Sequence, residues 1–140
     1  MTVTVESLSR YRELFEPGLR EAVDRLDPDT RRVVAYHLGW ADPDGRPVLA
    51  NPGKAIRPTL TLLVAEALTG MAETAVPGAV AAELVHNFSL VHDDLMDRDA
   101  ERRHRPTVWA LWGDATAVLA GDAMLSLAHE VLAGSDATHA

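Results

Sequence analysis

Residues 92–97 read His-Asp-Asp-Leu-Met-Asp and lie in an otherwise apolar stretch that favours a helix. Carboxylates at this spacing repel one another and are costly to remove from water, so an inward-facing cluster needs a compensating cation. All the ligands are oxygen, which favours a hard divalent ion such as Mg²⁺. Asp93 and Asp97 stand one helical turn apart and could bridge such ions. Because Mg²⁺ commonly completes its shell with water and substrate phosphates, the pattern predicts a phosphorylated partner.

Two other interpretations of the acidic cluster are considered, and the second is disfavoured. It could be a solvated helix end without a ligand. An EF-hand is disfavoured, because Arg102 stands where that loop requires glycine.

The stretch before the acids predicts a helix that packs inside a bundle. At about 100° per residue, its apolar side chains form a wide stripe that includes Phe88. The ionisable residues fall in one narrow arc, which we expect to face a wet cavity; they are Glu83, His86, Asp93, Asp94 and Asp97. His86 is a candidate site residue because of its place among the acids, although a lone helical histidine usually has a structural role.

Basic residues flank the acids on both sides. Arg102, Arg103 and Arg105 follow at once, and planar guanidinium groups suit phosphate oxygens. The alternative for these arginines is a set of weak surface ion pairs with the neighbouring acids. Upstream, Lys54 and Arg57 would flank a helix N-terminus, where backbone N–H groups favour an anion. A Walker loop is excluded, because its spaced glycines and its Lys-Ser/Thr pair are missing.

Together these motifs resemble the trans-prenyltransferases, also called polyprenyl or isoprenyl diphosphate synthases. The family pattern runs Gly-Lys-x-x-Arg-Pro, Glu-x-x-His, Asp-Asp-x-x-Asp, Arg-Arg and Pro-Thr. The matching segments here, in the same order, are residues 53–58, 83–86, 93–97, 102–103 and 106–107. Each motif is weak alone, but their order and spacing make the resemblance specific, and it covers residues 38–132.

The resemblance implies an all-α helical bundle of the isoprenoid synthase type I kind and a head-to-tail condensation of isopentenyl diphosphate with an allylic diphosphate. It implies that Asp93 and Asp97 bind Mg²⁺ and that Asp94 supports them. Arg102 is expected to contact the allylic diphosphate. The isopentenyl diphosphate is expected to contact four residues: Lys54, Arg57, His86 and Arg103.

The resemblance also bears on product length. In this family an aromatic residue five positions before the first motif aspartate often limits the product, and here that residue is Phe88, followed by the small Ser89. The first motif lacks the two-residue insertion of many bacterial enzymes. By analogy the chain is similar to the form that often makes geranylgeranyl diphosphate.

The largest departure from the family is length. Members are much longer than these 140 residues and carry a second aspartate-rich motif, whereas the later aspartates here stand far apart. The chain is therefore expected to be the N-terminal part, residues 1–140, of a single all-α domain, with half of the metal site. A homodimer or a complementing chain is the expected partner. The alternatives are a terpene cyclase fragment and a non-catalytic regulatory subunit of a prenyl synthase.

Composition narrows the function further. The net charge of −8 disfavours nucleic-acid binding, so local arginines and a metal must attract an anionic substrate. The absence of cysteine excludes disulfides and thiolate metal sites. No signal peptide or membrane span is evident, and a cytoplasmic protein is the simplest expectation.

Periodicity and turn residues predict helices over about 5–26, 31–39, 58–68, 77–98 and 115–133. The first is expected to be interrupted near Pro17, and Asp29 or Thr30 to cap the second. Residues 41–52 are expected to form a loop, and Trp109 and Trp112 to pack a helix junction. An incomplete bundle should leave apolar surface exposed.

Overall fold

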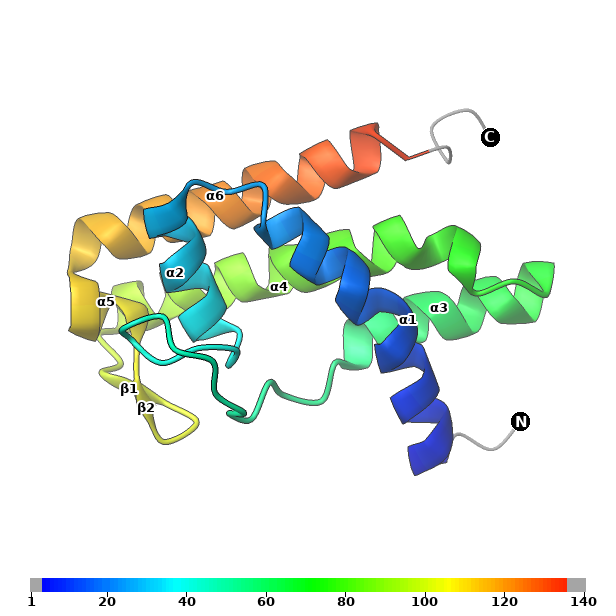
Figure 1. Ribbon diagram of the computed structural model, residues 1–140, viewed down its shortest axis with the longest axis horizontal. Coiled ribbons are helices and arrows are strands. Elements are labelled where there is room, and N and C mark those ends of the chain that lie inside the picture. Colours follow the sequence, from blue (N-terminus) through cyan, green and yellow to red (C-terminus); the bar gives the residue numbers. More distant parts are fainter. Residues whose placement is uncertain (1–3, 136–140) are drawn as a thin grey trace.

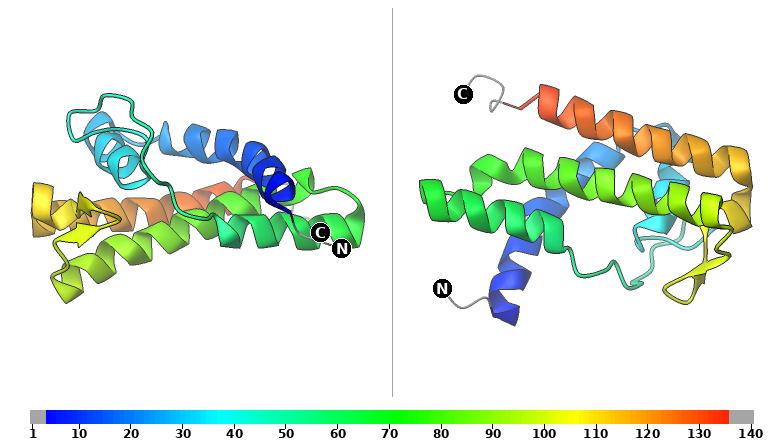
Figure 2. Two further views of the ribbon diagram at one scale, coloured as in Figure 1. Left: turned by 90° about the horizontal axis from the view of Figure 1, so that it is seen from below. Right: turned by 180° about the vertical axis from the view of Figure 1, so that it is seen from behind.

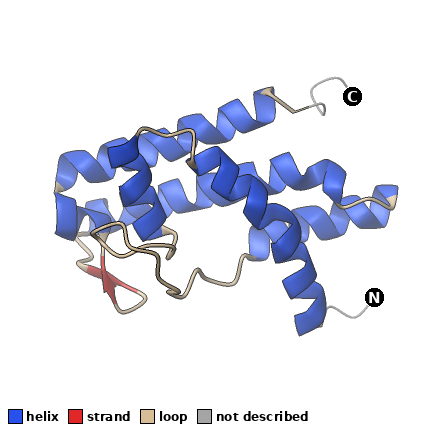
Figure 3. Cartoon of the chain, in the orientation of Figure 1, coloured by secondary structure: helices blue, strands red, loops and turns tan. Residues whose placement is uncertain are grey.

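The computed structural model describes residues 4–135, and in this range helices dominate (Figures 1 and 3). The predicted all-α class is confirmed. The helices, with one 3-10 turn, are α1 (Val5–Val23), α2 (Pro28–His37), α3 (Ile56–Thr69), η1 (Glu73–Ala75), α4 (Val76–Asp97), α5 (Val108–Trp112) and α6 (Asp114–Ala133). A short hairpin of β1 (Glu101–Arg102) and β2 (Arg105–Pro106) follows α4.

Among the described elements, α4 and α6 pack together most extensively. They run antiparallel and side by side (Figures 1 and 2). Leu84 of α4 and Met124 of α6 are fully buried between the packed helices. At one point the helices approach closely because Gly121 of α6 has no side chain. A Cβ atom there would lie 2.1 Å from Nε2 of His92 on α4. The ring of His92 therefore occupies the space that Gly121 leaves.

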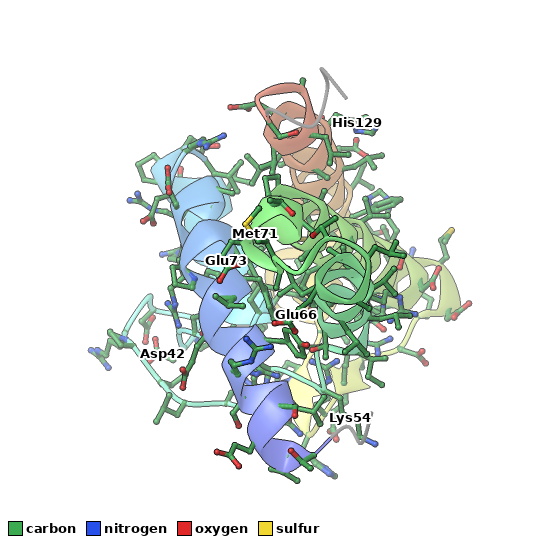
Figure 4. The ribbon with its side chains drawn as sticks, turned by 90° about the vertical axis from the view of Figure 1, so that its right-hand side faces the viewer. Asp42, Lys54, Glu66, Met71, Glu73 and His129 are labelled. Atoms are coloured by element: carbon green, nitrogen blue, oxygen red, sulfur yellow. The ribbon has the colours of Figure 1, made fainter. Side chains whose placement is uncertain are left out.

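Helix α1 crosses α3 and α4, and a polar contact fixes it to α3. The carboxylate of Glu66 accepts hydrogen bonds from Arg10, at 2.5 and 2.7 Å, and from the hydroxyl of Tyr11. Figure 4 shows Glu66 between the two helices. The expected interruption of α1 near Pro17 is wrong, because the helix is continuous through that residue. Phe15 and Leu19 are buried on either side of it, and their packing outweighs the lost backbone hydrogen bond.

Helix α2 begins earlier than its predicted start. Asp27, rather than Asp29 or Thr30, is the N-cap, and its carboxylate accepts the N–H groups of both, at 3.2 and 3.1 Å. Pro28 then takes the first helical position, where its missing N–H costs nothing. The loop that follows α2 is the predicted one, and an isolated bridge from Ala41 to Pro47 shapes it.

The hairpin of β1 and β2 was not expected. Its turn places Arg103 and His104 at positive φ, 51° and 63°. Such turns usually carry Asn or Gly, so Arg-His gave no turn signal. Trp112 stacks edge-on against Tyr36 at 5.2 Å, and Trp109 donates its indole N–H to the carbonyl of Asp99. The predicted packing role of both tryptophans is confirmed.

Large apolar side chains lie on the surface of α3, α4 and α6, as expected of an incomplete bundle. Those more than half exposed on these helices are Ile56, Leu60, Leu68, Met96 and Leu119. By length and composition alone α6 could cross a membrane, but core helices of soluble proteins pass the same test. The extensive packing of α6 on α4 fits the core interpretation.

We predict that Gly121→Ala destabilises the fold by about 1–3 kcal/mol, because the added methyl overlaps the His92 ring and forces the helices apart. Urea unfolding followed by circular dichroism measures the change. Gly78→Ala is the matched control, since its Cβ would meet nothing closer than Thr61 at 3.7 Å and should gain helix stability. Equal effects at both glycines would contradict the close approach.

Candidate functional site

The loop before α3 presents the first basic residues. Gly53, at a φ of 82°, and Ala55, at 50°, are both in the left-handed region, so the chain turns sharply there. The Gly53 N–H donates to the side chain of Asn51 at 2.9 Å, and its carbonyl accepts from Arg12 of α1 at 2.8 Å. These contacts fix the backbone on both sides of Gly53. They hold exposed Lys54 just before the start of α3, and Figure 4 shows it near the N-terminal half of α1.

The hairpin delivers a second basic group to the same loop. A Cβ atom on Gly53 would lie 2.7 Å from a guanidinium nitrogen of Arg103, so the glycine makes room for that side chain. Arg105 anchors the hairpin by donating to the carbonyls of Tyr36 and Ala41, at 2.9 and 2.8 Å. Arg105 therefore has a structural role, and Arg103 is left beside the loop that carries Lys54.

His86 of α4 lies among the arginines. Its pKa is lowered chiefly by partial burial, and the charges of Arg57, Arg103 and Arg102 lower it further. His86 is therefore close to positive charge from α3 and from the hairpin. The structure brings together the basic residues that the sequence predicted in separate motifs.

The acids do not form one strip, and this part of the prediction is wrong. Asp94 is only 3% exposed, and Glu83 is buried too, whereas Asp93 and Asp97 are exposed. Asp94 accepts hydrogen bonds from Nε and Nη2 of Arg102 at 2.8–3.1 Å. This ion pair replaces the surface pairs considered from sequence, and it raises the pKa of Arg102.

The exposed acids are free to bind a cation. The carboxylates of Asp93 and Asp97 make no side-chain hydrogen bond or ion pair within residues 4–135. Asp93 is close enough to Arg102 that its charge raises the guanidinium pKa. No group of three or more His, Cys, Asp or Glu in the described range could hold a metal. Two exposed carboxylates fit Mg²⁺, which accepts so few protein ligands when water and phosphate oxygens supply the rest.

A buried polar chain beneath the arginines was missed in the sequence. Nε2 of His37 contacts Oδ1 of Asn87 at 3.0 Å, and the Asn87 amide donates to the carbonyl and the carboxylate of Glu83. Burial raises the pKa of Glu83 despite the charges of nearby arginines, and burial lowers the pKa of His37 to about 4. Nothing in the spacing of His37 and Asn87, from different helices, marked them as partners.

The two residues expected to set product length have different surroundings. Phe88 stacks edge-on against His92, with centroids 5.3 Å apart, and packs on the core. Ser89 instead lines an open, mainly apolar cavity of about 560 Å³ together with Arg57, Val85 and His86. Ser89 is thus the one of the two that borders space next to the basic residues.

Comparison with known proteins identifies the family. A model of the polyprenyl synthetase family matches residues 45–140. The chain belongs to this family.

Individual relatives agree with the family assignment. The (2E,6E)-farnesyl diphosphate synthase of Mycobacterium tuberculosis (strain ATCC 25618 / H37Rv) is 65% identical over 97% of this chain and 38% of its own length. A geranylgeranyl diphosphate synthase of the same strain is 42% identical over 91% of this chain and 36% of its own. The crystal structure of a polyprenyl synthetase from Streptomyces coelicolor A3(2) superposes with a TM-score of 0.87, at 56% identity, over 92% of this chain and 38% of that chain. The chain thus spans little more than a third of these relatives.

We predict that only one of two neighbouring aspartates contributes to stability. Asp94→Ala should lower the free energy of unfolding by about 2 kcal/mol, because it leaves Arg102 without its partner. The loss should be below that of a fully buried pair, since the Arg102 side chain is 32% exposed. Asp93→Ala should leave the urea midpoint unchanged, because its carboxylate has no partner to lose. Similar midpoints for the two variants would contradict the division of the acids.

We also predict that His37 makes the fold acid-sensitive. The pKa is 6.5 in the unfolded chain and about 4 in the folded one, so the unfolded state takes up a proton first. Stability should be full above pH 6.5 and fall by about 2 kcal/mol by pH 5. Glu83, with its raised pKa, contributes in the opposite direction. Urea midpoints at pH 7 and pH 5, for the native chain and for His37→Gln, measure this change in stability. An equal loss of stability at pH 5 in both chains would contradict the role of His37.

Proposed function

We propose that this chain supplies the diphosphate-binding part and the first metal-binding part of a prenyl transferase. The reaction condenses isopentenyl diphosphate head to tail with an allylic diphosphate. Residues 1–140 then form the N-terminal part of a single all-α domain. The observation that supports this most is that Arg57 and His86 line one cavity, while Arg103 lies against the Gly53 loop and Arg102 is held by Asp94, the neighbour in sequence of the unpaired Asp93.

Each group has a chemical role in this proposal. Lys54, Arg57, His86 and Arg103 hold the diphosphate of isopentenyl diphosphate. Nε and Nη2 of Arg102 are occupied by Asp94, which leaves Nη1 to contact the allylic diphosphate. Asp93 and Asp97 would hold Mg²⁺, which when bound neutralises charge on the leaving diphosphate.

The bond changes follow from that arrangement. The allylic C–O bond breaks, and its electron pair leaves with the diphosphate. The double bond of isopentenyl diphosphate attacks the allylic carbon, and a proton is then lost from the coupled product. The apolar wall of the 560 Å³ cavity beside Arg57 and His86 would shelter the hydrocarbon from water.

The product length stays a prediction. The motif resemblance favoured a geranylgeranyl product, whereas a relative with 65% identity is named a farnesyl diphosphate synthase. Of the two residues expected to set product length, Phe88 and Ser89, only Ser89 lines the cavity. A homodimer or a complementing chain, supported by the exposed apolar surface, and a cytoplasmic location also stay predictions.

Binding and turnover together test the proposal. Calorimetry of the folded chain should show isopentenyl diphosphate binding that Arg57→Ala weakens at least tenfold, and Mg²⁺-dependent geranyl diphosphate binding that Asp93→Ala removes. Arg46→Ala, an exposed arginine that lines no part of the 560 Å³ cavity, is the control. Absence of binding of both diphosphates to the folded chain would contradict the proposal.

Incorporation of radiolabelled isopentenyl diphosphate then separates it from the regulatory-subunit alternative. The C-terminal part of the Mycobacterium tuberculosis farnesyl synthase, added to this chain, should restore product, and Asp93→Ala should prevent it. If this chain instead stimulates a full-length synthase and Asp93→Ala does so equally well, the chain is a non-catalytic subunit.

A further inference from the structure

A second cavity, of about 410 Å³, lies between the end of α1, helix α2 and the loop after it. It shares no residue with the proposed diphosphate site. The residues that line it are Arg20, Val23, Asp24, Pro28, Arg31, Arg32, Ala35, Trp40, Ala41, Gly45 and Pro47. Its size is typical of sites for small organic ligands, whereas the cavity of about 30 Å³ beside Asp94 has room for a single water.

The cavity is locally positive in an acidic chain. Arg20, Arg31, Arg32 and the single carboxylate of Asp24 line it; because Arg20 already pairs with Glu16 at 3.3 Å, one net positive charge is left here, against a net charge of −8 for the whole chain. Arg31 and Arg32 make no side-chain hydrogen bond or ion pair with any residue in the described part of the chain. Their donors are therefore available to a bound anion.

Apolar and aromatic groups also line the cavity. The guanidinium of Arg20 stacks over the ring of Trp40 at 4.2 Å, so the indole is held in place. Gly45 has a φ of 86°, and a Cβ atom there would be in ordinary van der Waals contact with Cδ of Arg32 at 3.6 Å, so the stem of Arg32 packs beside Gly45. A ligand in this space could contact charged, flat and apolar groups together.

We propose that this cavity binds a small organic phosphate. The phosphate would pair with Arg31 and Arg32, whose planar forks match its oxygens, and the organic part would lie against Trp40. Two guanidinium groups without an ion-pair partner in the described part of the chain can together contact several oxygens of one phosphate. The body of the ligand is either a flat ring or an aliphatic chain, and both would pack on the same wall.

Nuclear magnetic resonance of the ¹⁵N-labelled chain tests the site directly. The probes are adenosine monophosphate, geranyl monophosphate and inorganic phosphate, each titrated in the presence of EDTA. At least one organic phosphate should shift the Trp40 indole and the Gly45 amide saturably, and at least tenfold more tightly than inorganic phosphate does. Binding of adenosine monophosphate indicates a ligand with a flat ring, and binding of geranyl monophosphate indicates one with an aliphatic chain. No shift, or equal affinity for inorganic phosphate, would overturn the proposal.

Substitutions separate the cavity from general charge effects. Arg31→Gln combined with Arg32→Gln should weaken binding at least tenfold and leave the thermal unfolding midpoint unchanged, since neither side chain has a partner to lose. Arg25→Gln is the matched control, because Arg25 sits at the same end of α1 but makes only exposed ion pairs with Glu21 and Glu130. Undiminished binding in the double variant would overturn the assignment, and single Arg31→Gln serves as a second test of it.

Discussion

The ion pair between Asp94 and Arg102 is the contact on which the rest of the site depends. Asp94 is almost wholly buried at the end of α4, and its carboxylate would be costly there without a cation. Arg102 supplies that cation through two of its nitrogens and so binds the hairpin to α4. The hairpin in turn places Arg103 against Gly53. One buried charge pair thereby brings the second basic motif to the first.

The same pair explains how an acidic chain could accept an anionic substrate. Because Asp94 is paired with Arg102, Asp93 and Asp97 are the carboxylates that remain exposed at the end of α4. Their charge would repel a diphosphate, and a divalent ion held by these two carboxylates would offset that repulsion. Within residues 4–135, the basic side chains of Lys54, Arg57 and Arg103 form no ion pair with an acid of α4. The arrangement would thus keep the proposed metal-binding and phosphate-binding groups adjacent but separate.

Much of this could be predicted from the sequence, because it depended on local signals. The helical periodicity of 77–98 predicted α4, and the order of the motifs predicted the family. The burial of Asp94 could not be predicted from a helical wheel, since the wheel places Asp94 about 100° from Asp93 but does not say which of the two directions faces the bundle. Which of them turns inward depends on where the hairpin packs, and its Arg-His turn carried no sequence signal. The pairing of His37 with Asn87 likewise depends on how α2 packs against α4.

The central claim is that Asp93 and Asp97 hold a divalent ion while Asp94 stays with Arg102. Anomalous diffraction from crystals grown with Mn²⁺ and diphosphate tests it most directly. We expect an anomalous peak between the carboxylates of Asp93 and Asp97, with Asp94 still hydrogen-bonded to Arg102. A peak bound to Asp94, with its bond to Arg102 broken, would contradict the account.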